Sequence, residues 1–203
     1  MRVLLTGFEP FDNNPVNPSQ MLVERLPDFI DEVEIRKAIL PVDTTNAPKF
    51  LLAEMKSHRP DAVLAFGLAS ERSSISLERV ALNLMDFRIP DNAGVSITDK
   101  PVVEGGPNAY FTTLPIRSIA EALKTAGIPA EISLSAGSYL CNQVFYSLMH
   151  AISEERLPTL AGFIHLPALP EQAAETENAA ASISLESDIK AANIIIAQVY
   201  SAY

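Results

Sequence analysis

The sequence predicts an α/β protein, a three-layer α/β/α sandwich around a twisted sheet that is largely parallel or mixed. Apolar runs typical of buried strands alternate along the chain with amphipathic segments typical of helices, which is the pattern of a sheet covered on both faces. Neither an internal repeat nor a low-complexity linker divides the chain. Its 203 residues, 48% hydrophobic and 20% charged, are enough for one sizeable core, so we expect a single α/β domain over 1–203.

The individual elements follow from the spacing of apolar residues. Strands are expected at 2–8, 34–42, 61–68, 79–85, 130–137 and 161–168. Helices are expected between them at 18–26, 44–59, 116–127, 141–155 and 185–203. The remaining stretch 86–113 is long for a plain connection, and such loops are usually functional or contain a small hairpin.

Charge and hydropathy exclude several classes of partner. A formal net charge of −10 and an isoelectric point near 4.7 leave no basic stripe, which argues against nucleic acid and anionic membranes as main partners. The amino-terminal MRVLLTGFEP holds too short an apolar run for a signal sequence, and no segment approaches the roughly 20 apolar residues that span a bilayer. We therefore expect a cytoplasmic protein.

Cysteine and histidine usage points the same way. One cysteine cannot form an intramolecular disulfide, which indicates a reducing compartment, and with three histidines it makes no plausible zinc site. We expect neither a metal nor an organic cofactor.

The single cysteine, Cys141, lies where a reactive thiol is useful. Residues 130–135 alternate like a strand, Gly137 and Ser138 break it, and CNQVFYSLMHAISEE reads as a helix that Cys141 opens. A strand, a sharp turn and a nucleophile at the start of a helix expose a reactive atom at the edge of an α/β sheet. Because a helix N-terminus favours negative charge, we expect this thiol to ionise more easily than a free one.

A nucleophilic thiol needs a base, and three histidines are candidates. His58 lies in the last turn of a predicted helix, where a basic residue complements the dipole. His150 follows Cys141 by about two and a half turns of the same helix and faces the other way. His165 is placed near the end of an apolar strand, at the sheet edge where α/β proteins carry their sites, so elimination favours it.

A carboxylate that accepts the second imidazole N–H would complete the arrangement. Four acidic residues are candidates by this criterion: Glu78, Asp86, Asp91 and Glu104. Sequence spacing does not choose among them.

Five co-linear motifs resemble the pyroglutamyl peptidase I (pyrrolidone-carboxylate peptidase) family. They are LLTGFEPFDNNPVNPSQ, ISLERVALNLMDFRIPDNAG, GGPNAYFTTLPI, SAGSYLCNQVFYSLMH and GFIHLPALPEQ, and they span about residues 2 to 172. The resemblance implies a single cysteine-peptidase-like domain that removes an amino-terminal pyroglutamate from peptides without a cofactor, commonly as a homotetramer. It implies Cys141 as nucleophile, His165 as base and Glu78 as the orienting carboxylate.

The resemblance also implies a substrate pocket. Phe8 and Phe11 of TGFEPF correspond to the phenylalanines that pack on the pyroglutamyl ring, and Arg88 to an arginine near the scissile carbonyl. Tyr139 takes the place of an apolar or aromatic pocket residue. Asn17, followed by Pro18, is suited to cap the first helix and so to fix the loop that carries Phe11.

One stretch departs from the family pattern. GLASER at 67–72 stands where many members have GQAGGR, so Leu68 replaces a glutamine, and Ser70 and Glu71 replace glycines. Because of this change, two alternatives remain open. One is a related cysteine amidase that acts on a different cyclic or acylated amide, and the other is a non-catalytic binding module of the same fold.

Overall fold

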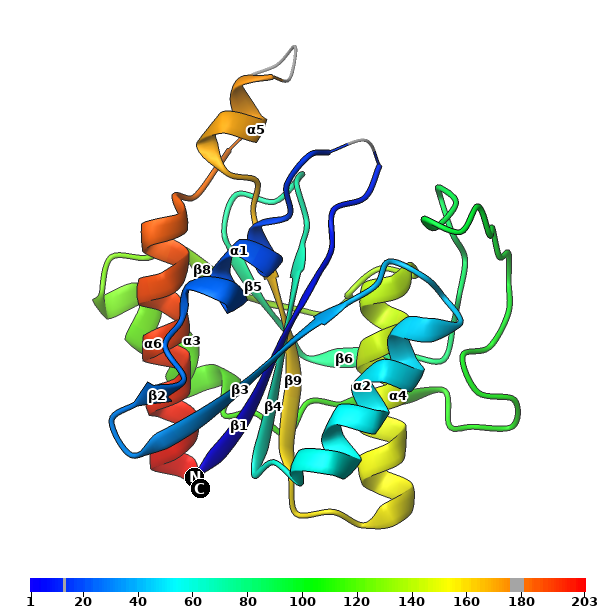
Figure 1. The fold of residues 1–203 in the computed structure, drawn as a ribbon, viewed down its shortest axis with the longest axis horizontal. Helices are drawn as coiled ribbons and strands as arrows, with labels where there is room; N and C mark the ends of the chain where they lie inside the picture. The colour runs from blue at the N-terminus through cyan, green and yellow to red at the C-terminus, as the bar shows by residue number, and fades with distance from the viewer. Residues whose placement is uncertain (13, 176–180) are drawn as a thin grey trace.

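A mixed sheet forms the centre of the computed structural model, which describes residues 1–12, 14–175 and 181–203 (Figure 1). Within these residues the sheet has seven strands: β1 (Arg2–Phe8), β2 (Phe29–Ile30), β3 (Val33–Leu40), β4 (Ala62–Leu68), β5 (Ile75–Glu78), β8 (Ala130–Ser133) and β9 (Leu160–Leu166). Their order is β2-β3-β1-β4-β9-β5-β8. Strands β3, β1, β4 and β9 run parallel, whereas β2 is antiparallel to β3 and β5 to β9.

Helices cover both faces of this sheet and make the three layers visible in Figure 1. One layer holds α1 (Pro18–Arg25), α3 (Ile116–Thr125) and α6 (Leu185–Ala202), and the other holds α2 (Asn46–His58) and α4 (Leu140–Glu155). Alternate residues of β1 supply the two cores, with Val3 and Leu5 in the first and Leu4 in the second. The predicted three-layer α/β/α sandwich is confirmed, and its sheet is mixed.

The strand predicted at 79–85 is present only as three residues, Val80–Leu82, and it belongs to a separate small sheet because the chain leaves the main sheet at Arg79. Its N–H donates to the carbonyl of Ser133 at 2.8 Å, and its own carbonyl accepts from Thr112 at 3.0 Å, so Arg79 joins two sheets. On one side lies β5, which ends at Glu78, and on the other a small hairpin of β6 (Val80–Leu82) and β7 (Ala109–Phe111). The long stretch 86–113 therefore contributes a hairpin strand, while the short α5 (Pro170–Ala174) and β2 lacked a usable signal.

The parallel strands end together at one edge of the sheet. There β1 ends at Phe8, β4 at Leu68 and β9 at Leu166, and α4 begins at the same level (Figure 1). None of the helices in the described part of the chain is long and apolar enough to cross a membrane. The edge formed by these strand ends is where open α/β sheets place their ligands.

One acidic side chain outside this edge, in the C-terminal helix α6, is fully buried. Asp188, in the first turn of α6, has no solvent exposure, and neither carboxylate oxygen has a hydrogen-bond partner among the described residues. Burial raises the pKa of Asp188 from 3.8 to about 7. The unfolded chain therefore ionises this group at lower pH than the folded chain does, and the free energy of unfolding falls as pH rises from about 4 to about 7.

Asp188→Asn should remove this pH dependence, because the amide cannot ionise. The free energy of unfolding of the variant minus that of wild type should therefore increase by up to about 4 kcal/mol as the pH rises from 4 to 8. Urea unfolding at several pH values measures it, with the exposed Glu186→Gln of the same helix turn as matched control. An Asp188→Asn protein with the wild-type pH slope contradicts the prediction.

Candidate active site

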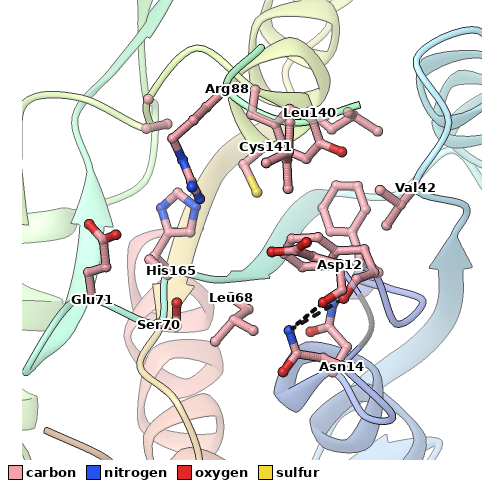
Figure 2. Close-up of a pocket in the computed structure, with 18 of the residues that line it drawn as sticks. Asp12, Asn14, Val42, Leu68, Ser70, Glu71, Arg88, Leu140, Cys141 and His165 are labelled. Carbon is pink, nitrogen blue, oxygen red and sulfur yellow. Dashed lines mark hydrogen bonds between the residues drawn. The ribbon is translucent and has the colours of Figure 1, made fainter. Parts of the chain in front are cut away.

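A pocket of about 300 Å³ opens at the carboxyl edge of the sheet. Its lining comes from segments that are far apart in sequence: Phe8 and Phe11 from the end of β1 onward, residues 68–72 from the end of β4 onward, Tyr139 and Cys141 at the start of α4, and His165 on β9. Figure 2 shows the Cys141 sulfur directed into this opening, with His165, Leu68 and Arg88 around it. The fold thus brings the predicted nucleophile and the predicted base into one pocket.

Cys141 is the second residue of α4, and its position is fixed from two sides. The next residue, Asn142, is fully buried and hydrogen-bonds the backbone of Leu82 in both directions, at 2.9 and 2.8 Å. On the sheet side, a Cβ added to Gly67 would lie 2.9 Å from the Cys141 sulfur, closer than real Cβ atoms approach. Glycine at position 67 therefore allows the thiol to pack directly on β4.

His165 is the neighbour of Gly67 across the sheet, since the two residues are register partners in the parallel β4–β9 pair. The imidazole is 4% exposed, and its ring lies 4.8 Å from that of Phe163. No hydrogen bond joins the Cys141 sulfur to the imidazole within the described residues. Both groups line the same pocket on the α4 side of the sheet.

Glu78 reaches His165 from the adjacent antiparallel strand. In the β5–β9 register Glu78 pairs with Phe163 and Ser76 with His165, so Glu78 and His165 are diagonal neighbours on one face, within reach of a long side chain. The Oε1 atom of Glu78 lies 2.7 Å from His165 Nδ1, and Glu78 has no solvent exposure. An ionised carboxylate only accepts hydrogen bonds, so Nδ1 carries the proton and Nε2 is the nitrogen left to accept another.

The other sequence candidates lie in different surroundings. His58 ends α2 and contacts Glu54 at 3.1 Å, and His150 Nδ1 lies 2.9 Å from the Tyr110 hydroxyl. Asp91 accepts backbone N–H groups of its own loop and of Thr44. The exposed residues Asp86 and Glu104 make no side-chain contact with the imidazole, so Glu78 is the one of the four carboxylates that the fold brings to His165.

Burial keeps both partners of the expected proton transfer neutral. It raises the pKa of the Cys141 thiol from 9.0 to about 12, with the Glu78 carboxylate adding to the rise and the Arg72 guanidinium opposing it. Burial also lowers the pKa of His165, an effect that the hydrogen bond to Glu78 offsets in part. The expectation of an easily ionised thiol is therefore wrong for the free protein, because loss of solvation outweighs the helix N-terminus.

Three aromatic side chains line the pocket. Phe8 is 3% exposed and its ring lies 6.4 Å from that of Phe163, while Phe11 lies 6.3 Å from Tyr139. The Tyr139 ring also contacts Phe87 edge-on at 4.9 Å, and its hydroxyl donates to the Pro90 carbonyl at 3.1 Å. The fold thus brings the three predicted ring-binding residues into the lining of one pocket.

Asn17 and Arg88 also line this pocket. Asn17 caps α1 as expected, because its Oδ1 accepts from the Ser19 N–H at 3.0 Å, and its Nδ2 donates to the Glu9 carbonyl at 3.0 Å. It thereby ties the loop that carries Phe11 to α1. Arg88 is exposed, and Figure 2 shows its side chain extending toward the opening that Cys141 and His165 share.

The stretch that departs from the family pattern also borders the pocket. Leu68, Ser70 and Glu71 all line it, with Ser70 and Glu71 exposed. Neither Ser70 nor Glu71 has a positive φ, so the loss of two glycines here introduces no left-handed backbone strain. What changes is the set of side chains at the pocket edge.

Comparison with known proteins gives the family. A family profile described as "Pyroglutamyl peptidase" matches residues 1–202. The chain belongs to the pyroglutamyl peptidase family. A pyrrolidone-carboxylate peptidase of Thermococcus onnurineus is 44% identical over 196 residues, which are 97% of each chain. Pyrrolidone-carboxylate peptidase 1 of Ralstonia nicotianae is 48% identical over 173 residues, 85% of this chain and 80% of the relative.

Solved structures of this family match the whole fold. A mutant pyrrolidone carboxyl peptidase from Pyrococcus furiosus superposes with a TM-score of 0.97 at 40% identity, covering 100% of this chain and 99% of the other. Pyroglutamyl peptidase I of Bacillus amyloliquefaciens gives a TM-score of 0.94 at 40% identity, covering 98% and 97%. The family resemblance read from the five motifs is thus confirmed.

Three site residues were missed by the sequence analysis. Asn142 and Gly67 position the thiol, and Arg72 contacts Glu78 at 2.6 Å. Of the three, Gly67 had a usable signal, a glycine near the end of an apolar strand, which often marks a close approach. Among the described residues, no group of three or more His, Cys, Asp and Glu side chains is arranged to hold a metal ion.

The raised thiol pKa predicts how Cys141 reacts with iodoacetamide. Because the thiolate is the reacting form, alkylation of the free protein should become about tenfold faster per pH unit between pH 7 and pH 9, without reaching a plateau. Mass spectrometry of quenched samples gives the rate, and Cys141→Ser is the unlabelled control. A plateau at or below neutral pH would reveal a preformed thiolate and contradict the prediction.

Proposed function

We propose that this protein is a cysteine peptidase that hydrolyses the amide bond after an N-terminal pyroglutamyl residue, with Cys141 as nucleophile, His165 as base and Glu78 as orienting carboxylate. The observation that carries the proposal is the 2.7 Å hydrogen bond from His165 Nδ1 to buried Glu78, in the pocket that also holds the only cysteine. A thiol, an imidazole and an orienting carboxylate are the groups that covalent acyl transfer uses. Membership of the pyroglutamyl peptidase family supports the choice of substrate.

Both reacting groups are neutral at rest, so the proton moves during the attack. His165 Nε2 takes the thiol proton as the sulfur bonds to the pyroglutamyl carbonyl carbon, and the carbonyl oxygen becomes an oxyanion. Tyr139, the N-cap of α4, makes no side-chain hydrogen bond to the first turn, which leaves first-turn amides to stabilise that oxyanion together with Arg88. His165 then gives its proton to the leaving amine. In the second half, His165 takes a proton from the water that attacks the thioester carbon, the C–S bond breaks to release pyroglutamate, and His165 returns the proton to the Cys141 sulfur.

The pocket suits a neutral ring. Pyroglutamate presents a flat lactam without an amine charge, and Phe8, Phe11 and Tyr139 offer apolar walls for it. Free glutamate would bring charges that these walls desolvate without a partner. Proline lacks the lactam carbonyl and carries a charged amine, so it should also be a poor substrate.

A second candidate is a related cysteine amidase that takes a different cyclic or acylated amide. The observation in its favour is that Leu68, Ser70 and Glu71, which replace the common glutamine and glycines, line the pocket. The third alternative, a non-catalytic binding module, has no comparable observation in its support, since the Glu78–His165 pair is of little use to it.

We also propose a cytoplasmic homotetramer. A single cysteine without a disulfide partner suits a reducing compartment, and exposed apolar side chains such as Phe111 (71%) and Leu134 (70%) suit burial between subunits. Light scattering on the eluting peak of a sizing column measures the mass, and a monomeric mass would contradict the tetramer proposal.

One assay separates the three functional candidates. Pyroglutamyl, prolyl and free glutamyl anilides are tested with and without a thiol alkylator. Release from pyroglutamyl anilide alone, abolished by alkylation, supports the peptidase. Release from another acyl group favours the amidase, and saturable binding without turnover favours the binding module.

Substitutions of the three central residues should separate chemistry from orientation. Cys141→Ala and His165→Ala should each lower kcat by at least about a thousandfold, because nucleophile and base act as one unit. Glu78→Gln should leave a small residual activity, since the imidazole stays in place with a weaker partner. His58→Gln, at the helix end remote from the pocket, is the matched control and should retain wild-type kcat. Unchanged turnover by Glu78→Gln would mean that this carboxylate does not orient the base.

Two pocket substitutions should act unequally on kcat/KM for pyroglutamyl anilide. Phe11→Ala should lower it by at least about tenfold, because one wall of the ring slot is lost. Leu68→Gln, which restores the common family residue, should change it by less than about tenfold, roughly 1.4 kcal/mol, since backbone groups do most of the lactam recognition. Phe50→Ala, an exposed aromatic on α2, is the control. A large gain in kcat/KM for Leu68→Gln would indicate that the protein is adapted to another substrate. An unchanged kcat/KM for Phe11→Ala would show that Phe11 does not form part of the ring-binding site.

A further inference from the structure

Arg72 is a second partner of the buried carboxylate that holds the imidazole. Its Nη1 lies 2.6 Å from Glu78 Oε1, and its Nη2 donates to the Ser135 carbonyl at 2.8 Å. The Arg72 side chain is 25% exposed and that of Glu78 is 0% exposed. One guanidinium therefore ties the loop after β4 to the carboxylate on β5 and to the segment that leads into α4.

The two hydrogen bonds to Glu78 converge on the same oxygen. Oε1 accepts from both Arg72 and His165 Nδ1, at 2.6 and 2.7 Å, whereas Oε2 is buried and has no hydrogen-bond partner among the described residues. Because the two contacts share one oxygen position, turning the Glu78 side chain to another rotamer would break both of them at once. Arg72 thus selects the rotamer in which Glu78 faces the imidazole.

We propose that Arg72 is a positioning residue of the hydrolytic site, which orients the Glu78 carboxylate toward His165 and holds the backbone at Ser135 before the nucleophile helix. This inference rests on the proposed peptidase function. Arg72 would act through Glu78 and Ser135, because within the described residues it makes no hydrogen bond to the Cys141 sulfur or to the His165 imidazole.

The charge of Arg72 has a separate, measurable effect. Glu78 on β5 contacts His165 directly, and the other titratable or charged groups that line the pocket with it are Asp12, Glu71, Arg72, Arg88, Tyr139 and Cys141. The guanidinium lowers the pKa of His165 and opposes the rise in the pKa of Cys141. Removing this cation therefore raises both pKa values, so the base becomes protonated at higher pH and the thiol ionises less.

The test compares Arg72→Gln and Arg72→Lys with Arg79→Gln. Arg79 lies next to Glu78 in sequence, but its side chain lines a different cavity with Phe111 and Arg117, which makes it the matched control. Pyroglutamyl anilide gives kcat and KM from pH 5 to 9, iodoacetamide gives the alkylation rate at pH 8, and urea unfolding gives stability.

Arg72→Gln should lower kcat by about 10- to 100-fold with KM within about threefold, the range expected for losing a hydrogen bond to a charged group. The acid limb of its kcat–pH profile should move to higher pH, and iodoacetamide should alkylate Cys141 more slowly than in wild type. Arg72→Lys should have an acid limb of the pH profile near that of wild type, because the charge remains. Its kcat should still be lower than that of wild type, because one ammonium cannot reproduce the forked contact. Arg79→Gln should behave as wild type.

Wild-type kcat, acid limb and alkylation rate in Arg72→Gln would overturn the proposal. Equal losses in all three variants, in proportion to lowered stability, would also overturn it, because they would indicate a merely structural arginine. If the wild-type protein does not hydrolyse pyroglutamyl anilide, the proposed function fails, and the alkylation rates still decide whether Arg72 acts on the thiol and imidazole.

Discussion

The site depends on a carboxylate that has been removed from water. Glu78 is fully buried, and a buried charge is costly unless donors surround it. Here a guanidinium and an imidazole N–H converge on one oxygen at 2.6 and 2.7 Å. Each donor needs a different part of the chain to be in place: the turn after β4 for Arg72, and the antiparallel β5–β9 register for His165. The buried charge therefore links correct folding of the sheet edge to the orientation of the His165 imidazole.

Rigid elements, rather than flexible loops, carry the three central groups. Cys141 is on a helix that Asn142 fastens to β6, His165 is on a central strand and Glu78 ends the strand beside it. Gly67 then sets the distance between helix and sheet at the thiol, because any side chain there would meet the sulfur. Such support restricts the geometry of the reacting atoms more tightly than loops would. The loops supply much of the pocket lining instead, among them residues 69–72 after β4.

Local patterns predicted most of the fold, and contacts between distant residues account for what was missed. Apolar periodicity predicts β1, β4, β9 and the five long helices to within a few residues. The elimination that favoured His165 also needed only local information. Choosing Glu78 required the β5–β9 register, which spacing does not contain, so that choice rested on the family resemblance. Arg72 lies in a polar loop whose sequence gives no sign that one side chain turns inward to a buried carboxylate.

The failed expectation about the thiol has a mechanistic consequence. A helix N-terminus favours the thiolate, but the packing of Cys141 against Gly67 and its neighbours removes more solvation than the helix restores. The same packing keeps His165 neutral. In the mechanism that we propose, a charge pair then forms only when a carbonyl carbon is present to accept the sulfur's electrons and the first-turn amides receive the new oxyanion. In that mechanism burial makes thiolate formation depend on substrate, while the contacts of Glu78 with Arg72 and His165 fix the orientation of the neutral imidazole.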